Sequence, residues 1–329
     1  MKKILSRKTV VSTLIASTLA LAALPAHAEW KGWNIHVPDY PVSAAMDKFS
    51  TLIDEKTGGE VTAKTYHSGV LGSQPDAIKQ VQLGGLDFAV FNMGPMGPIV
   101  PEANVVSLPF IFKDMDHMHR VMDGKFGDTM SAAMEKKGLV ALAWYDSGAR
   151  SFYNSIRPIN KPADLKGLKF RVMNNELFVG MVESLGGNAT PMAFSEVFQS
   201  LKTNVIDGAE NNWPSYESTN HFEVAGFYSG SQHLILPECL CISKSTWDQL
   251  SDDNKVHVKE AARESAVLQR KLWAERAEQS RAKVESGGIK FNEIANKAPF
   301  QDAMGPVYEK AVAKNPALKA LIEQIRSVD

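Results

Sequence analysis

Two side chains suited to binding an anion occur in the segment 163–215. Arg171 lies in a strand predicted for residues 169–172, and Asn211 follows a second strand predicted for residues 205–207. A guanidinium group presents a planar fork of N–H donors that matches a carboxylate in two parallel hydrogen bonds. No catalytic motif stands between the two residues, so the segment predicts a site that holds an anion without transforming it. An ordinary salt bridge is the alternative role for Arg171.

Three other polar side chains occur at the ends of predicted strands. These are His36, Asn92 and Arg150, the last of which follows a strand predicted for residues 141–145. In an open α/β sheet, ligands bind beyond the carboxyl ends of the strands. We therefore expect these side chains to border the same site as Arg171.

Familiar catalytic signatures are absent from the sequence. It has no glycine-rich dinucleotide loop, P-loop, H-E-x-x-H zinc motif or G-x-S-x-G elbow. His117 and His119 are two residues apart, and on a helix such a pair does not share a face. We expect no cofactor, no metal ion and no catalytic residues.

The first 28 residues resemble an export signal. A basic start with four Lys and Arg precedes an apolar run over residues 9–24, and Ala26-His27-Ala28 offers a cleavage site. Cleavage would leave 32 Lys and Arg against 37 Asp and Glu, a net charge of −5. We expect a periplasmic protein that, once cleaved, has no stable insertion in the membrane and does not bind nucleic acid.

The two cysteines, Cys239 and Cys241, alternate with apolar residues in a predicted strand. Side chains at i and i+2 point to the same face of a strand but do not converge. We therefore expect two buried thiols, because unpaired cysteine is among the most buried residue types.

Strand-like and helix-like patterns alternate along the chain, which is typical of α/β layering. Predicted strands cover residues 33–37, 61–66, 86–92, 141–145, 151–154, 169–172, 205–207 and 234–243. Predicted helices cover residues 41–55, 76–83, 175–185 and 194–201, and a long one covers residues 251–285.

A two-lobed α/β fold is expected from this order and from the length of the chain. Each lobe would hold a mostly parallel sheet flanked by helices, and the long helix would either span both lobes or break partway. The predicted first lobe comprises about 29–147 and 236–275, and the second about 148–235 and 276–329. Lobes joined by crossing strands enclose ligands in the cleft between them.

Several sequence motifs resemble those of one transport family. They are LGSQPDAIKQVQLGGLDFAV, ANVVSLPFIFKD, KPADLKGLKFRV and TPMAFSEVFQSLKTNVIDGAEN, in this order. They are similar to motifs of the DctP-type solute-binding proteins of TRAP transporters, the tripartite ATP-independent periplasmic class. The resemblance covers essentially the whole chain after residue 28. It implies a ligand-binding protein that delivers an organic acid to membrane permease subunits.

The resemblance also implies roles for individual residues. Arg171 would pair with the ligand carboxylate, Asn211 would support that carboxylate, and Arg150 would assist. Asn92 and Gln74 occupy two loops in which family members often carry an acidic residue, so the contacts of these amides stay open.

Three loops resemble the branch of the family that binds hexuronates such as galacturonate and glucuronate. They contain His36, Trp213 and Glu238. His36 and Glu238 would bind sugar hydroxyls, and Trp213 would lie against a C–H face of the sugar. Interlobe packing is the alternative for Trp213, and a salt bridge is the alternative for Glu238.

We therefore expect a periplasmic TRAP solute-binding protein for a carboxylate-bearing ligand, most specifically a hexuronate. The same fold could instead bind a C4-dicarboxylate or a keto acid. A periplasmic enzyme acting on sugar acids is the alternative from another class, with His36 as the candidate base.

Overall fold

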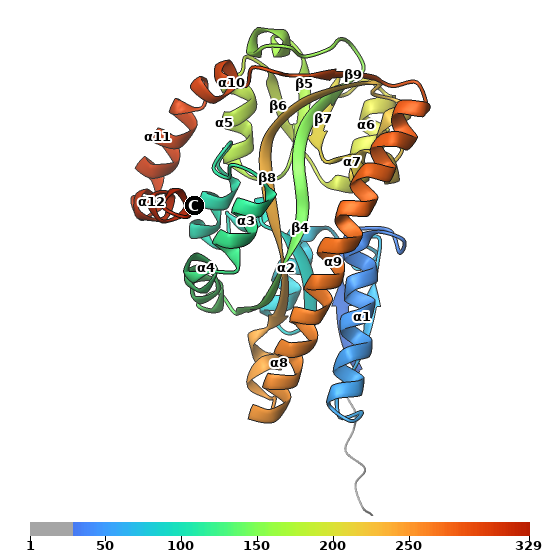
Figure 1. Ribbon diagram of the computed structural model, residues 1–329, viewed down its shortest axis with the longest axis vertical. Coiled ribbons are helices and arrows are strands. Elements are labelled where there is room, and N and C mark those ends of the chain that lie inside the picture. The colour runs from blue at the N-terminus through green and yellow to red at the C-terminus, as the bar shows by residue number, and fades with distance from the viewer. Residues whose placement is uncertain (1–28) are drawn as a thin grey trace, which may run out of the picture.

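A computed structural model describes residues 29–329, which form two α/β lobes on one nine-stranded sheet (Figure 1). The predicted signal peptide, residues 1–28, lies outside the described residues. The strand order is β2-β1-β3-β8-β4-β7-β5-β6, and β9 pairs with β8. The strands are β1 (Glu29–Trp33), β2 (Thr62–Tyr66), β3 (Phe88–Asn92), β4 (Leu139–Asn154), β5 (Lys169–Val172), β6 (Asn188–Pro191), β7 (Gly208–Asn211), β8 (Phe227–Ser243) and β9 (Lys290–Glu293).

Helices cover the sheet in both lobes (Figure 1). The α-helices are α1 (Pro41–Lys56), α2 (Gln74–Gln82), α3 (Met115–Met122), α4 (Lys125–Glu135), α5 (Glu176–Ser184), α6 (Val197–Lys202), α7 (Trp213–Ser218), α8 (Lys244–Asp248), α9 (Asp252–Ser286), α10 (Ala298–Asp302), α11 (Gly305–Lys314) and α12 (Leu318–Arg326). Short 3-10 helices are η1 (Gly94–Met96), η2 (Pro101–Ser107), η3 (Pro162–Leu165), η4 (Phe194–Glu196) and η5 (His221–Glu223).

The long strands β4 and β8 run from one lobe into the other (Figure 1). Strands β1, β2 and β3 pair in parallel at one end of the sheet, and β5, β6 and β7 do so at the other. The pairs β3 with β8, β8 with β4 and β4 with β7 are antiparallel. The predicted two-lobed α/β class is confirmed. The predicted residue boundaries of the lobes stay a prediction.

Helix α9 is unbroken over 35 residues and packs against α1, β4 and α7 (Figure 1). The Ser251 hydroxyl begins it by accepting a hydrogen bond from the Asn254 backbone N–H at 3.2 Å. Its contacts with α1 and α7 place it along both lobes. Of the two alternatives expected from the sequence, the helix therefore spans both lobes and does not break partway. Within residues 29–329, no helix is both long enough and apolar enough to cross a membrane.

A bulge bends strand β4 where it passes between the lobes. Its register with β8 shifts between Asp146 and Ala149. Gln269 of α9 holds this point, because its side chain accepts from the Asp146 N–H at 2.8 Å and donates to the Asp146 carbonyl at 2.9 Å. Gly148 adopts φ +62°, and a Cβ there would lie 2.8 Å from Nε1 of Trp273. The bulge thus fits only glycine at position 148, where the backbone is pressed against α9.

Several strands differ from the sequence-based prediction. The first strand ends at Trp33, not Val37, because the Asn34 side chain accepts a hydrogen bond from the His36 N–H at 2.7 Å and turns the chain. The strand predicted for residues 205–207 is β7, Gly208–Asn211, whereas Val205 is exposed after a turn. Strands predicted for 141–145 and 151–154 are parts of the single strand β4.

The prediction of two free thiols is wrong, because Cys239 and Cys241 form a disulfide. Their Cα atoms are 5.5 Å apart, within the range that a disulfide spans. The neighbouring strand β4 has a register shift between Ala141 and Ala143, opposite this pair. The i and i+2 spacing keeps two cysteines apart in an ideal strand, but this strand pair is irregular.

Candidate functional site

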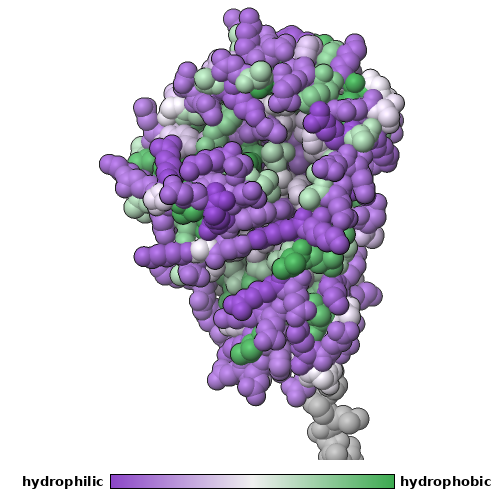
Figure 2. Space-filling view, in the orientation of Figure 1, coloured by the Kyte–Doolittle hydropathy of each residue, from purple (hydrophilic) through white to green (hydrophobic). Residues whose placement is uncertain are grey.

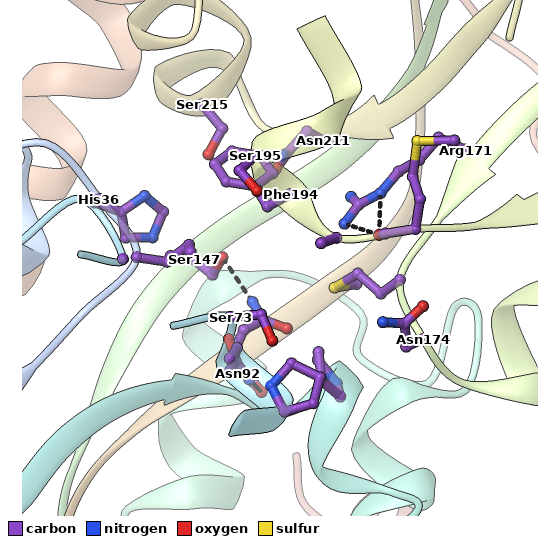
Figure 3. Close-up of a pocket in the computed structure, with 18 of the residues that line it drawn as sticks. His36, Ser73, Asn92, Ser147, Arg171, Asn174, Phe194, Ser195, Asn211 and Ser215 are labelled. Atoms are coloured by element: carbon purple, nitrogen blue, oxygen red, sulfur yellow. Dashed lines mark hydrogen bonds between the residues drawn. The ribbon is translucent and has the colours of Figure 1, made fainter. Parts of the chain in front are cut away.

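A cavity of about 120 Å³ lies between the lobes and receives side chains from both (Figure 3). Residues 35–36, 68–69, 72–75, 92 and 95 contribute from the first lobe, and residues 171, 173–174 and 192–195 from the second. Seven of the eight side chains predicted from the sequence line it: His36, Gln74, Asn92, Arg150, Arg171, Asn211 and Glu238.

Arg150 is buried and fully engaged by neighbours on β7. Its Nε and Nη2 atoms donate to the two carboxylate oxygens of Glu210 at 2.6 and 2.8 Å. Its Nη1 donates to Oδ1 of Asn211 at 2.7 Å. Burial alone would raise the pKa of Glu210, but the Arg150 guanidinium lowers it to about 2. Arg150 is therefore neutralised inside the protein, and it orients Asn211 at the cavity wall.

Arg171 differs from Arg150, because no carboxylate within residues 29–329 forms an ion pair with it. Its Nε and Nη2 atoms both donate to the backbone carbonyl of Met192, at 3.1 and 2.9 Å (Figure 3). Only 4% of the side chain is exposed, and burial lowers the pKa of its guanidinium to about 10. Arg171 therefore remains charged at neutral pH, with Nη1 available to a ligand.

Phe194 is a cavity residue that the sequence reasoning missed. Its ring centroid lies 5.8 Å from Cζ of Arg171 and 6.3 Å, edge to face, from the ring of His36 (Figure 3). The residue had been interpreted only as the start of a helix. Strand β6, which precedes it, was not predicted from the sequence, so no signal marked Phe194 as a residue beyond the end of a strand.

The first-lobe wall is a network of polar side chains around Asn92. The Asn92 amide nitrogen donates to Oε1 of Glu238 and to Oγ of Ser147, both at 3.2 Å. Gln74 supports this wall by donating to the Asn92 backbone carbonyl at 2.7 Å. Asn92 and Gln74, whose contacts the sequence left open, thus belong to one hydrogen-bond network. Ser147, on the β4 bulge, had not been identified as a site residue.

The lobes touch each other beside His36. Its imidazole stacks on Tyr40, with ring centroids 3.9 Å apart, and the Tyr40 hydroxyl lies 2.9 Å from Oγ of Ser215 in the second lobe. Burial raises the pKa of the Tyr40 hydroxyl, so it stays protonated. Asn212 adds a second contact by donating to the Ser147 carbonyl at 2.7 Å.

Trp213 is the one predicted site residue that does not line the cavity, which corrects its placement against a sugar. Its ring stacks on Tyr228 at 3.6 Å between centroids, and Cζ of Arg281 lies 5.5 Å from it. The reason is local, since the Asn212 side chain accepts from the Ser215 N–H and begins α7 at Trp213. The indole therefore packs α7 against β8 and α9.

The family described as bacterial extracellular solute-binding protein, family 7 (DctP), matches residues 34–315. A solute-binding protein of Chromohalobacter salexigens is 54% identical over 297 residues, which is 90% of this chain and 88% of that protein.

Two solved structures are also similar. A TRAP periplasmic solute-binding protein from Roseobacter denitrificans, with bound β-D-glucuronate, has a TM-score of 0.91 at 62% identity, covering 92% of this chain and 100% of that one. One from Sulfitobacter, with bound β-D-galacturonate, has a TM-score of 0.90 at 59% identity, covering 91% and 99%.

Replacing Glu210 by Gln should destabilise the protein, because Arg150 would keep a buried charge without its partner. We expect the free energy of unfolding to fall by about 3–5 kcal/mol near pH 7. The carboxylate stabilises the fold above its ordinary pKa of 4.5 and loses this effect as pH falls toward its folded pKa of about 2. The difference between the two proteins should therefore shrink in acid, as urea denaturation at about pH 7 and pH 3 would show.

Glu176→Gln is the matched control, because Glu176 forms an exposed ion pair with Lys314. An exposed pair contributes little, so this variant should unfold nearly as the wild type does. A Glu210→Gln deficit that stayed the same at both pH values would contradict the ion-pair assignment.

Proposed function

The chain belongs to the DctP family of TRAP-transporter solute-binding proteins, and from this premise we propose that it captures a hexuronate, such as glucuronate or galacturonate, between its lobes. The family is extracytoplasmic, so the predicted periplasmic location is confirmed.

The observation that carries the proposal is the unpaired guanidinium of Arg171. A charge with 4% exposure and no carboxylate partner among the described residues is unfavourable unless a ligand compensates it. A carboxylate beside Nη1 and Nη2 would make charge-assisted hydrogen bonds. Asn211, held by Arg150, is placed to support the same carboxylate.

The rest of the cavity suits a polyhydroxylated molecule. Asn92, Ser147 and Glu238 offer hydrogen-bonding groups on the first-lobe wall, and Phe194 offers an apolar face on the opposite side. A pyranose ring has hydroxyls on its edge and C–H groups on its faces, so it can use both walls. Bound glucuronate and galacturonate in the two similar structures support this assignment.

Delivery follows from the contact between the lobes. A ligand that touches both lobes binds the closed form more tightly than the open form and shifts the equilibrium by that difference. Tyr40 and Ser215 join the lobes beside the cavity. We infer that the closed, loaded protein is the form that presents its ligand to the membrane permease subunits of a TRAP transporter.

Arg171→Ala tests the proposal directly. We expect glucuronate and galacturonate to bind about 100- to 1,000-fold more weakly, because the buried carboxylate loses its charged partner. Isothermal titration calorimetry of the purified variant measures this loss.

Arg281→Ala is the matched control, since Arg281 lies over Trp213 and outside the cavity. It should retain the wild-type affinity. Wild-type affinity in Arg171→Ala would remove Arg171 from the ligand site, and absence of uronate binding to the wild type would refute the proposal itself.

We further propose that the cavity binds its ligand without chemical change. His36, the candidate base, is stacked on Tyr40, and its Nε2 lies 3.9 Å from Oε1 of Glu238. The rings of His36 and Tyr40 thus both belong to the contact between the lobes. Galacturonate incubated with the protein should be recovered unreacted, as proton NMR of the mixture would show. Protein-dependent formation of a lyase or isomerase product would overturn this statement.

A further inference from the structure

Two charged side chains of the cavity, Arg171 and Glu238, form no ion pair with a carboxylate, guanidinium or ammonium group within residues 29–329, and they stand on different lobes. Arg171 comes from β5 and has no carboxylate partner within residues 29–329. Glu238 comes from β8, and the nearest basic group in the same range is Nε2 of His36, 3.9 Å from its Oε1. Arg150 does not alter this balance, because Glu210 neutralises it. The cavity therefore has one positive end and one negative end.

Glu238 is held facing the cavity by the sheet itself. It stands directly opposite Asn92 in the antiparallel pair of β8 and β3, and only 3% of it is exposed. Within residues 29–329, its side chain accepts one hydrogen bond, from the Asn92 amide at 3.2 Å. A carboxylate has about four acceptor positions and no donor. The remaining positions can be satisfied by hydroxyl groups of a ligand but not by another carboxylate.

Charge repulsion from Glu238 would let the cavity distinguish ligands with one carboxylate from ligands with two. In a cavity shielded from water, two opposed negative charges repel far more strongly than in bulk solvent. An aldaric acid differs from a uronic acid in that its C1 is also a carboxylate. When one carboxylate is bound at Arg171, the far end of the molecule faces the first-lobe wall.

We propose that Glu238 restricts the cavity to acids with a single carboxylate, by accepting a hydroxyl of the uronate and repelling the second carboxylate of an aldaric acid. The inference rests on the proposed function, because it requires Arg171 to hold the first carboxylate. Selection of this kind works through an unfavourable contact with the wrong ligand. The same contact disfavours C4-dicarboxylates.

A purely structural role for Glu238 makes a different prediction. If the carboxylate only orients Asn92, its replacement weakens every ligand by a similar factor and leaves the preference among ligands unchanged. The ratio of affinities, and not the affinity for one ligand, therefore distinguishes the two roles.

Glu238→Gln is the test, because the amide keeps the shape and one acceptor oxygen but removes the charge. Calorimetry near neutral pH would compare galacturonate with galactarate, and glucuronate with glucarate, for the wild type and the variant. We expect the wild type to prefer each uronate by about 100-fold or more, and the variant to reduce this ratio by about 10-fold or more through tighter aldarate binding.

A shape-matched ligand provides a measurement that needs no variant. The monoamide of galactaric acid keeps one carboxylate for Arg171 and is open-chain like the diacid, but its other end is neutral and can donate to Glu238. The wild type should bind this monoamide about 10-fold or more tightly than galactarate. This comparison decides the matter if Glu238→Gln does not fold.

Three outcomes overturn the inference. An affinity ratio in Glu238→Gln within about threefold of the wild-type ratio would refute the charge-based role, as would equal binding of monoamide and diacid by the wild type. Both leave uronate capture intact. A wild type that binds no uronate refutes the proposed function and this inference with it.

Discussion

A buried guanidinium without a carboxylate partner is the constraint from which the organisation of this protein follows. Arg171 stays charged at neutral pH. The Met192 carbonyl accepts its hydrogen bonds, the Phe194 ring lies beside it, and the negative charge of Glu210 partly offsets its lost hydration. Such a charge is tolerated where strand, loop and neighbouring strands hold it rigidly. Under the proposed function, a ligand carboxylate would give this guanidinium a charged partner, and that interaction would contribute to the free energy of binding.

The surrounding structure keeps this charge separate from the protein's own acidic groups. Glu210 is committed to Arg150, and Glu238 stands on a strand of the other lobe beside Asn92. The face of the molecule in Figure 2 is mostly hydrophilic, whereas Arg171 and Glu238 are buried. Strands β4 and β8 join the lobes, and the bulge in β4 lies against α9. The backbone that carries the cavity residues Ser147, Arg150 and Glu238 therefore also connects the lobes.

Most of the polar side chains predicted at strand ends and in the loops after them line the cavity, whereas a side chain turned by a helix start and a buried pair distant in sequence could not be predicted. Arg171 could be placed at the cavity from the sequence because its strand, 169–172, was predicted correctly and ligand clefts of α/β sheets lie beyond the strand ends. Trp213 was misplaced because the side chain of its neighbour Asn212 starts a helix there and turns the indole away from the cavity. The Arg150 partner, Glu210, lies 60 residues away in sequence, and no local pattern reveals such a buried pair.

A crystal structure of the protein with galacturonate tests the central claim most directly. The account predicts a closed complex with the sugar between the lobes and both carboxylate oxygens within hydrogen-bonding distance of the Arg171 guanidinium. It also predicts that the Arg150 ion pair with Glu210 persists in the complex. A carboxylate bound elsewhere in the cavity, with Arg171 still donating only to the Met192 carbonyl, would contradict the account.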